Sequence, residues 1–219
     1  MNSNIGSKVT QSVDDIKKAL KKQATLLTVD TDGNSQSNKS WFGKVSLFSK
    51  DESVPLDKDS NPMRSVLQLY IPSMPYIPAS LNETVLLTVF VSKDYIDWVV
   101  REYQDTEHLY TKNFNNDSFF EVSPIKFELI DEDYPIDSDM LDCEDDIIAL
   151  ENSGKISDYF DVFEHIGGHK VGGYPTFLQY PIYFGEDDEI IFQLEVGDSN
   201  FFFAKNLKTN QWSIDFQST

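Results

Sequence analysis

The stretch 169–179 carries the feature that most restricts the fold, a double glycine followed by tyrosine and Pro175. Glycine adopts a positive φ without steric cost, and proline then fixes φ and excludes a helix. Gly172 and Gly173 therefore predict a sharp turn of the backbone at this point. The apolar run 190–196 follows the turn and predicts a buried strand.

An earlier part of the chain repeats this pattern. Gly43 aligns with Gly172, and Gln68, which lies inside an apolar run, aligns with Gln193. The two matches have nearly the same separation along the chain, which predicts a unit present in two copies rather than a solenoid. A chance likeness between short apolar strands is the alternative.

The remaining elements follow from periodicity and turn signals. Residues 1–10 read as a polar tail, and Ser12 to Asp15 has the form of a capping box that starts a helix. The stripe along that helix is Val13, Ile16, Leu20, Ala24 and Leu27. Further helices are predicted within 94–104 and 157–165, and strands at 41–48, 65–71, 83–91, 125–130, 190–196 and 201–204. Three prolines in 72–78 predict a corner, and 197–200 predicts a hairpin turn.

The formal net charge is −19, and most of it lies after residue 130. Such a charge repels nucleic acid and anionic membrane surfaces and would attract a basic partner, although solubility alone also explains it. The candidate partner-binding residues are Asp137, Asp139, Asp142, Glu144, Asp145, Asp146, Glu186, Asp187, Asp188 and Glu189.

Several features predict a cytoplasmic protein. The longest apolar run, 85–91, is too short to span a bilayer, and no secretory signal is visible at the N-terminus. Cys143 is the only cysteine, so the chain cannot form an internal disulfide.

No motif for catalysis or for a cofactor stands out. His165 and His169 have the spacing of two zinc ligands on a helix, but the intervening glycines break that helix and the required glutamate is absent. The chain has no nucleophile elbow and no phosphate-binding loop, and Cys143 lies among carboxylates that would raise its pKa. We therefore predict no catalytic residue, no metal and no cofactor.

Gln68 and Gln193 are polar residues within apolar strands, so each must find hydrogen-bond partners if it is buried. The backbone of the glycine-containing turn is the expected partner, and ligand binding is the alternative. The ligand candidates are His169, Gln179, Gln193 and Gln68, and the residues expected to shape the turns are Gly43, Gly172, Gly173 and Pro175.

The motif His-Lys-Val-Gly-Gly-Tyr-Pro at 169–175, followed by Phe-Gln-Leu at 192–194 and Gly-Asp-Ser-Asn-Phe-Phe-Phe at 197–203, resembles the YwqG-like family of bacterial proteins. The first copy departs from it, since Gly-Lys-Val-Ser stands at 43–46 where the family has Gly-Gly-x-Pro. The resemblance implies an α+β fold of β-rich mixed sheets with an N-terminal helix and an internal duplication. It implies one domain at 11–219, with halves of about 11–130 and 131–219, after the 1–10 tail.

The resemblance brings no catalytic residues, but similar proteins occur beside bacterial toxin genes. It therefore implies a protein-binding module, an immunity protein that neutralises a basic toxin such as a nuclease, without fixing the oligomeric state. The alternative is a small-ligand-binding protein or an enzyme. The binding module predicts an acidic or aromatic surface patch, whereas the alternative predicts a pocket near the Gly172 turn with converging polar groups.

Overall fold

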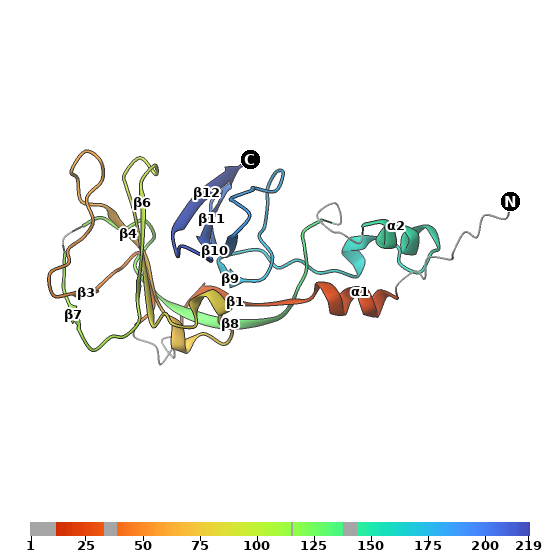
Figure 1. Ribbon diagram of the computed structural model, residues 1–219, viewed down its shortest axis with the longest axis horizontal. Coiled ribbons are helices and arrows are strands. Elements are labelled where there is room, and N and C mark those ends of the chain that lie inside the picture. Colours follow the sequence, from red (N-terminus) through yellow and green to blue (C-terminus); the bar gives the residue numbers. More distant parts are fainter. Residues whose placement is uncertain (1–11, 33–38, 115, 138–143) are drawn as a thin grey trace.

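The computed structural model describes residues 12–32, 39–114, 116–137 and 144–219. Strands predominate among these residues (Figure 1). In chain order the elements are α1 (Val13–Leu20), β1 (Lys22–Val29), β2 (Trp41–Phe42), β3 (Leu47–Ser49), β4 (Arg64–Tyr70), η1 (Ile71–Ser73), η2 (Ala79–Leu81), β5 (Leu86–Val91), β6 (Trp98–Tyr103), β7 (Leu109–Thr111), β8 (Ser123–Asp133), α2 (Glu144–Asn152), η4 (Tyr159–Asp161), β9 (Lys170–Gly172), β10 (Asp188–Val196), β11 (Ser199–Asn206) and β12 (Trp212–Ser218).

Ten strands form one sheet in the order β12-β11-β10-β9-β1-β8-β2-β4-β5-β6, and each neighbouring pair is antiparallel. β3 and β7 form a separate antiparallel pair. The expected α+β class with mixed sheets is therefore wrong, because the described residues form only two α-helices and the large sheet is antiparallel. Short turns join β10, β11 and β12, and a short turn can connect only antiparallel strands.

The strand order is symmetric about the central pair β1 and β8. β8 leads outward to β2, β4, β5 and β6, and β1 leads outward to β9, β10, β11 and β12. The registers repeat too, because Trp41 lies opposite Gln68 in one copy and Lys170 lies opposite Gln193 in the other. β4 and β10 also carry a register shift at matching positions. The sheet thus has an approximate two-fold axis between β1 and β8, and this axis relates the two copies of the repeat.

The sheet curls until its two edges meet through side chains. Glu102 of β6 forms an ion pair with Lys205 of β11 at 2.9 Å. The same carboxylate accepts a hydrogen bond of 2.8 Å from the indole of Trp212 in β12. Further along, the Trp98 ring lies 5.1 Å from the Phe201 ring. These contacts complete a nearly closed barrel of ten strands.

The main hydrophobic core fills this barrel and draws on both copies. Leu67 and Val89 come from one copy and Phe192 and Phe203 from the other, and all four are almost fully buried. The Phe192 and Phe203 rings stack at 4.1 Å. Burying a side chain of this size contributes about 1.5–3 kcal/mol. The curled sheet is therefore stabilised chiefly by its filled interior.

The two ends of the barrel are closed differently. At the end that we call the plugged end, the segment 71–81 between β4 and β5 inserts Ile71 and Leu81 into the main core. The backbone of Tyr76 exchanges two hydrogen bonds with the Thr25 hydroxyl, at 2.7 and 3.0 Å. This segment, with η1 and η2, lies at the bottom of Figure 1, and the tip of β12 marks the opposite end at the top. At that open end β10 and β11 are joined only by the tight turn at Gly197.

A helical lobe extends from the barrel beside the start of β1 and the end of β8 (Figure 1). It has its own core, in which Ile16 of α1 packs with Leu150 of α2 and with Phe163. Ser12 caps α1, because its hydroxyl accepts a hydrogen bond from the Asp15 amide. The predicted capping box is therefore confirmed.

Three helix predictions need correction. The helix expected to carry its stripe to Leu27 ends at Leu20, because the residues that follow form β1 and pair with β8 and β9. The helix expected within 94–104 is wrong, since that segment forms β6 and pairs with β5. Of the helix expected at 157–165, only the short 3-10 turn η4 forms.

Candidate binding site at the open end of the barrel

Gln68 and Gln193 have equivalent internal roles. The Gln68 amide donates to the Lys39 carbonyl at 2.7 Å and accepts from the Ser46 amide at 3.0 Å. The Gln193 amide donates to the Gly168 carbonyl at 2.8 Å and accepts from the Thr176 amide at 2.7 Å. Each glutamine thus joins the chain before a glycine turn to the chain after it.

The glycines at the turns have the backbone that only glycine adopts easily. Gly43, Gly172 and Gly173 have φ values of +66°, +79° and +70°. A Cβ on Gly172 would lie 2.5 Å from the Tyr76 ring, and one on Gly173 would lie 2.3 Å from the Asp133 carboxylate. These positions therefore exclude a side chain both by conformation and by space.

The Asp133 carboxylate is the centre of a buried network behind the double glycine. It accepts hydrogen bonds from the Lys170 ammonium at 2.8 Å and from the amides of Ile166 at 3.0 Å and Tyr174 at 2.7 Å. Both members of the ion pair are almost inaccessible to solvent. Burial lowers the pKa of Lys170, and Asp133 opposes that shift. The network fixes the turn that precedes Pro175.

His165 extends this network toward β10. Its Nδ1 lies 2.7 Å from the Tyr134 carbonyl, and its Nε2 lies 2.8 Å from the Thr176 hydroxyl. A carbonyl only accepts, so the proton resides on Nδ1 and Nε2 accepts from Thr176. Burial, followed by the charge of Lys170, lowers the pKa of His165. The ring is therefore neutral at pH 7, and its two hydrogen bonds connect the end of β8 to the chain after the double-glycine turn.

The four ligand candidates do not converge on one polar pocket. His169 accepts a hydrogen bond from the Glu195 amide at 3.0 Å and packs against the Phe42 ring at 5.1 Å. Gln179 instead donates to the Ser218 carbonyl at 2.8 Å, on the exposed surface. Gln68 and Gln193 belong to separate copies of the repeat.

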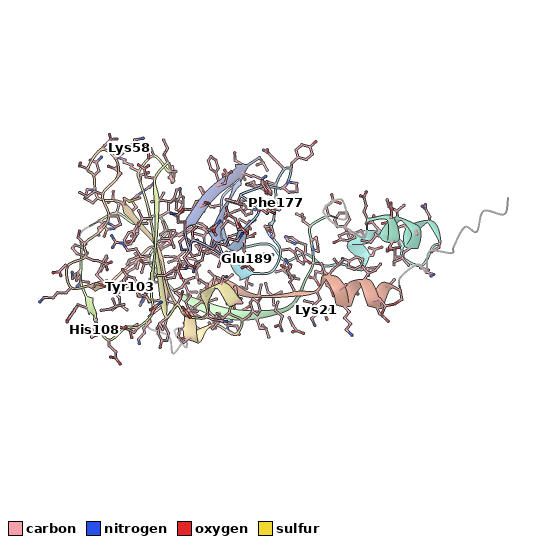
Figure 2. The ribbon with its side chains drawn as sticks, in the orientation of Figure 1. Lys21, Lys58, Tyr103, His108, Phe177 and Glu189 are labelled. Carbon is pink, nitrogen blue, oxygen red and sulfur yellow. The ribbon has the colours of Figure 1, made fainter. Side chains whose placement is uncertain are left out.

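The candidate acidic residues fall into two separate groups. Glu144, Asp145 and Asp146 form the first turn of α2, where they complement the helix dipole. The residues from Glu186 to Glu189 precede or begin β10 at the plugged end, and Figure 2 labels Glu189. Asp187 pairs there with Lys208 at 2.8 Å, and Asp188 accepts from Asn206 at 2.7 Å. Asp137 follows β8, and Asp139 and Asp142 lie outside the described residues.

An apolar groove of about 570 Å³ lies at the open end, between the two edges of the sheet. We call it the seam groove. Its lining comes from the β5–β6 connection and the first residue of β6, from the chain before β8 and from β10 to β12: Asp94, Tyr95, Ile96, Trp98, Phe119, Val196, Ser199, Phe201, Ile214, Asp215 and Phe216. Ile96 and Phe216 are 66% and 55% exposed. Large apolar side chains are thus presented to solvent in one concave place.

The aromatic wall of the seam groove is held by local contacts. The Trp98 indole donates to the Tyr95 carbonyl at 2.9 Å, and the Tyr95 ring meets the Phe119 ring edge-on at 5.6 Å. The Arg64 guanidinium lies 4.6 Å from the Tyr95 ring and donates to the Ser92 carbonyl. The wall is therefore preorganised before any partner binds.

A smaller hollow of about 260 Å³ lies at the same end of the barrel. We call it the histidine hollow, and it is lined by Val29, Phe42, Phe120, Glu121, Ser123 and His169. Phe120 of this hollow and Phe119 of the seam groove contact each other edge-on at 4.8 Å. The two cavities are therefore neighbours across one pair of rings.

The ionised side chains that line both cavities are carboxylates, namely Asp94, Asp215 and Glu121. Asp94 lies 3.3 Å from Lys58 at the exposed rim, and its hydrogen bond with Ser92 is the main cause of its lowered pKa. Burial lowers the pKa of His169, which is therefore neutral at pH 7. The open end thus combines an aromatic surface with a negative rim, which suits an apolar segment flanked by cations.

Within the described ranges, no group of three or more His, Cys, Asp or Glu side chains could hold a metal ion. No helix among the same residues is long and apolar enough to cross a membrane.

Residues 40–205 match the model of a domain of unknown function, DUF1963. The chain belongs to this family. The match begins just before β2 and ends within β11, so it takes in strands from both copies of the repeat. No curated protein matches the chain.

Local sequence patterns do not predict the aromatic lining of the seam groove. They favour a helix at Trp98 and a strand at Phe201, and neither pattern indicates a groove. The Gly-Asp turn at Gly197 gave one usable signal, because a tight hairpin leaves nothing to cover its end of a sheet. Local patterns do not predict that the two distant edges of the sheet meet.

Proposed function

We propose that this DUF1963 protein is a non-enzymatic protein-binding module that captures a basic protein at the open end of its barrel. The seam groove carries the proposal, since it exposes aromatic side chains and its charged lining groups are carboxylates. Aromatic residues dominate the energetics of many interfaces, and complementary charge speeds association and selects the partner. The formal net charge of −19 would also attract a basic partner.

The resemblance to the YwqG-like family makes the proposal more specific. A toxin with a basic surface, such as a nuclease, would meet both requirements, with an apolar side chain seated in the groove and lysines or arginines beside Asp94 and Asp215. The protein would then be an immunity protein acting in the cytoplasm, where a single cysteine remains reduced.

A small-ligand site at the double-glycine turn has less support. The hollow beside Tyr174 and Pro175 is small, about 240 Å³, and its lining is formed by Pro, Tyr and Phe side chains. The polar groups that a ligand would need are Gln193, His169 and Gln179, and they are engaged by other parts of the chain.

Two matched variants test the proposal. Phe216 lines the seam groove and Leu207 lies at the plugged end, and both side chains are 55% exposed. A basic protein captured by the wild type should be identified, purified and titrated against both variants. We expect Phe216→Ala to weaken binding by about 30-fold, since truncating a central aromatic anchor costs about 2 kcal/mol or more.

Leu207→Ala should bind like the wild type. High salt should weaken the complex, because the charge on the rim is exposed to solvent. Equal binding by Phe216→Ala and the wild type, or a partner that is not basic, would refute the proposal.

A further inference from the structure

The two-fold symmetry of the sheet shows what the open end lacks. The axis between β1 and β8 exchanges the two ends of the barrel. Ser123 of β8 pairs with Phe42 of β2, as Thr25 of β1 pairs with Val171 of β9. Ser123 at the open end is therefore equivalent to Thr25 at the plugged end. At the plugged end the Thr25 hydroxyl is engaged by the backbone of Tyr76. The Ser123 hydroxyl donates only a long bond of 3.3 Å to the nearby Glu121 carbonyl.

The chain covers the open end only in part. The Phe120 carbonyl lies against Gly43, as the Tyr76 ring lies against the equivalent Gly172. The histidine hollow beside Ser123 remains open, however, and the seam groove lies on the other side of the Phe119 and Phe120 rings. No segment like 71–81 exists between β10 and β11, because a tight turn joins these strands.

We infer that the open end binds a short proline- and aromatic-containing segment of the partner, which occupies it as the chain's own segment 71–81 occupies the plugged end. This inference rests on the proposed function and adds the form of the partner. The Ser123 hydroxyl exchanges hydrogen bonds with the backbone of that segment, and an aromatic ring enters the histidine hollow. Basic residues on either side of the segment face Glu121, Asp94 and Asp215.

A peptide copied from the segment at the plugged end, which we call the plug peptide, serves as the probe for this inference. A fluorescent peptide with the sequence of residues 71–78, flanked by lysines at both ends, is titrated with the full-length protein, and binding is followed by anisotropy. A second peptide carries alanine in place of the tyrosine that corresponds to Tyr76. A third keeps the lysines and replaces the apolar core with glycine and serine.

Two variants with matched controls locate the binding. Ser123→Ala should weaken binding of the plug peptide by about five-fold, the usual value for one hydrogen bond. Phe216→Ala should weaken the same binding by about ten-fold or more. Ser53→Ala is the control for the first, because the Ser53 hydroxyl also makes one long bond, 3.4 Å, to a nearby carbonyl. Leu207→Ala is the control for the second.

The inference requires that the plug peptide bind more tightly than both altered peptides and that only Ser123→Ala and Phe216→Ala weaken it. No binding up to about 1 mM, equal binding of the lysine control, or no effect of Ser123→Ala would overturn it. A basic protein partner that binds through Phe216 but is not displaced by the plug peptide would also overturn it, while leaving the proposed function intact.

Discussion

The buried pair Asp133 and Lys170 gives the most quantitative prediction for the fold. Asp133→Asn keeps the size of the side chain but leaves the Lys170 ammonium without a counter-charge in a place closed to solvent. Three groups donate hydrogen bonds to the Asp133 carboxylate: the Lys170 ammonium and the amides of Ile166 and Tyr174. The NH2 group of an asparagine would face at least one of these donors and could not accept from it. Breaking a buried ion pair from one side costs about 3–5 kcal/mol.

Lys170→Met should cost less than Asp133→Asn. In that variant the amides of Ile166 and Tyr174 still donate to the Asp133 carboxylate, and methionine fills most of the space of the lysine stem. The double variant should be more stable than the sum of the two single losses by about 1.5 kcal/mol or more, because it no longer contains the unpaired ammonium.

Urea unfolding followed by tryptophan fluorescence measures these differences, and thermal unfolding should show a fall of about 6–20 °C for Asp133→Asn. A loss below about 1 kcal/mol for Asp133→Asn, or strict additivity in the double variant, would show that the network does not hold the turn as described.

Two further predictions concern the same region. Gly172→Ala should lower the free energy of unfolding in urea by about 3 kcal/mol or more, because it adds a clash with the Tyr76 ring to the strain of a positive φ. Gly154→Ala, at φ +70° with open space around it, should lower it by only about 1–2 kcal/mol. Equal losses in the two variants would contradict the clash. Burial lowers the pKa values of His165 and His169 below 6.5 in the folded protein. Below about pH 6.5 the unfolded chain therefore binds more protons than the folded protein, and stability should decline as the pH falls. His169→Gln should reduce that decline, and an unchanged pH profile would contradict the shift at His169.

Local patterns in the sequence predicted the turns and much of the strand content. The double glycine, the hairpin at Gly197 and the roles of Gln68 and Gln193 follow from φ preferences and from the need of a buried amide for partners. The repeat of these signals also predicted two related copies, but not the order of their strands, in which β1 joins the second copy.

Features that depend on long-range pairing were not predictable in this way. The spacing of Tyr95, Trp98, Val99 and Tyr103 fits a helical face, yet pairing with β5 imposes a strand on most of this segment. The seam groove combines Trp98, Phe119, Phe201 and Phe216, which come together only because the sheet curls and its edges meet. The candidate acidic residues that the structure describes lie elsewhere, in and before α2 and around the start of β10.

Hydrogen–deuterium exchange on a complex with an identified basic partner tests the central claim most directly. The account predicts slowed exchange at the open end, in 94–98, 119–123 and 214–216, and unchanged exchange at the plugged end, in 79–84 and 205–210. Protection confined to α2, to the start of β10 or to the plugged end would contradict it.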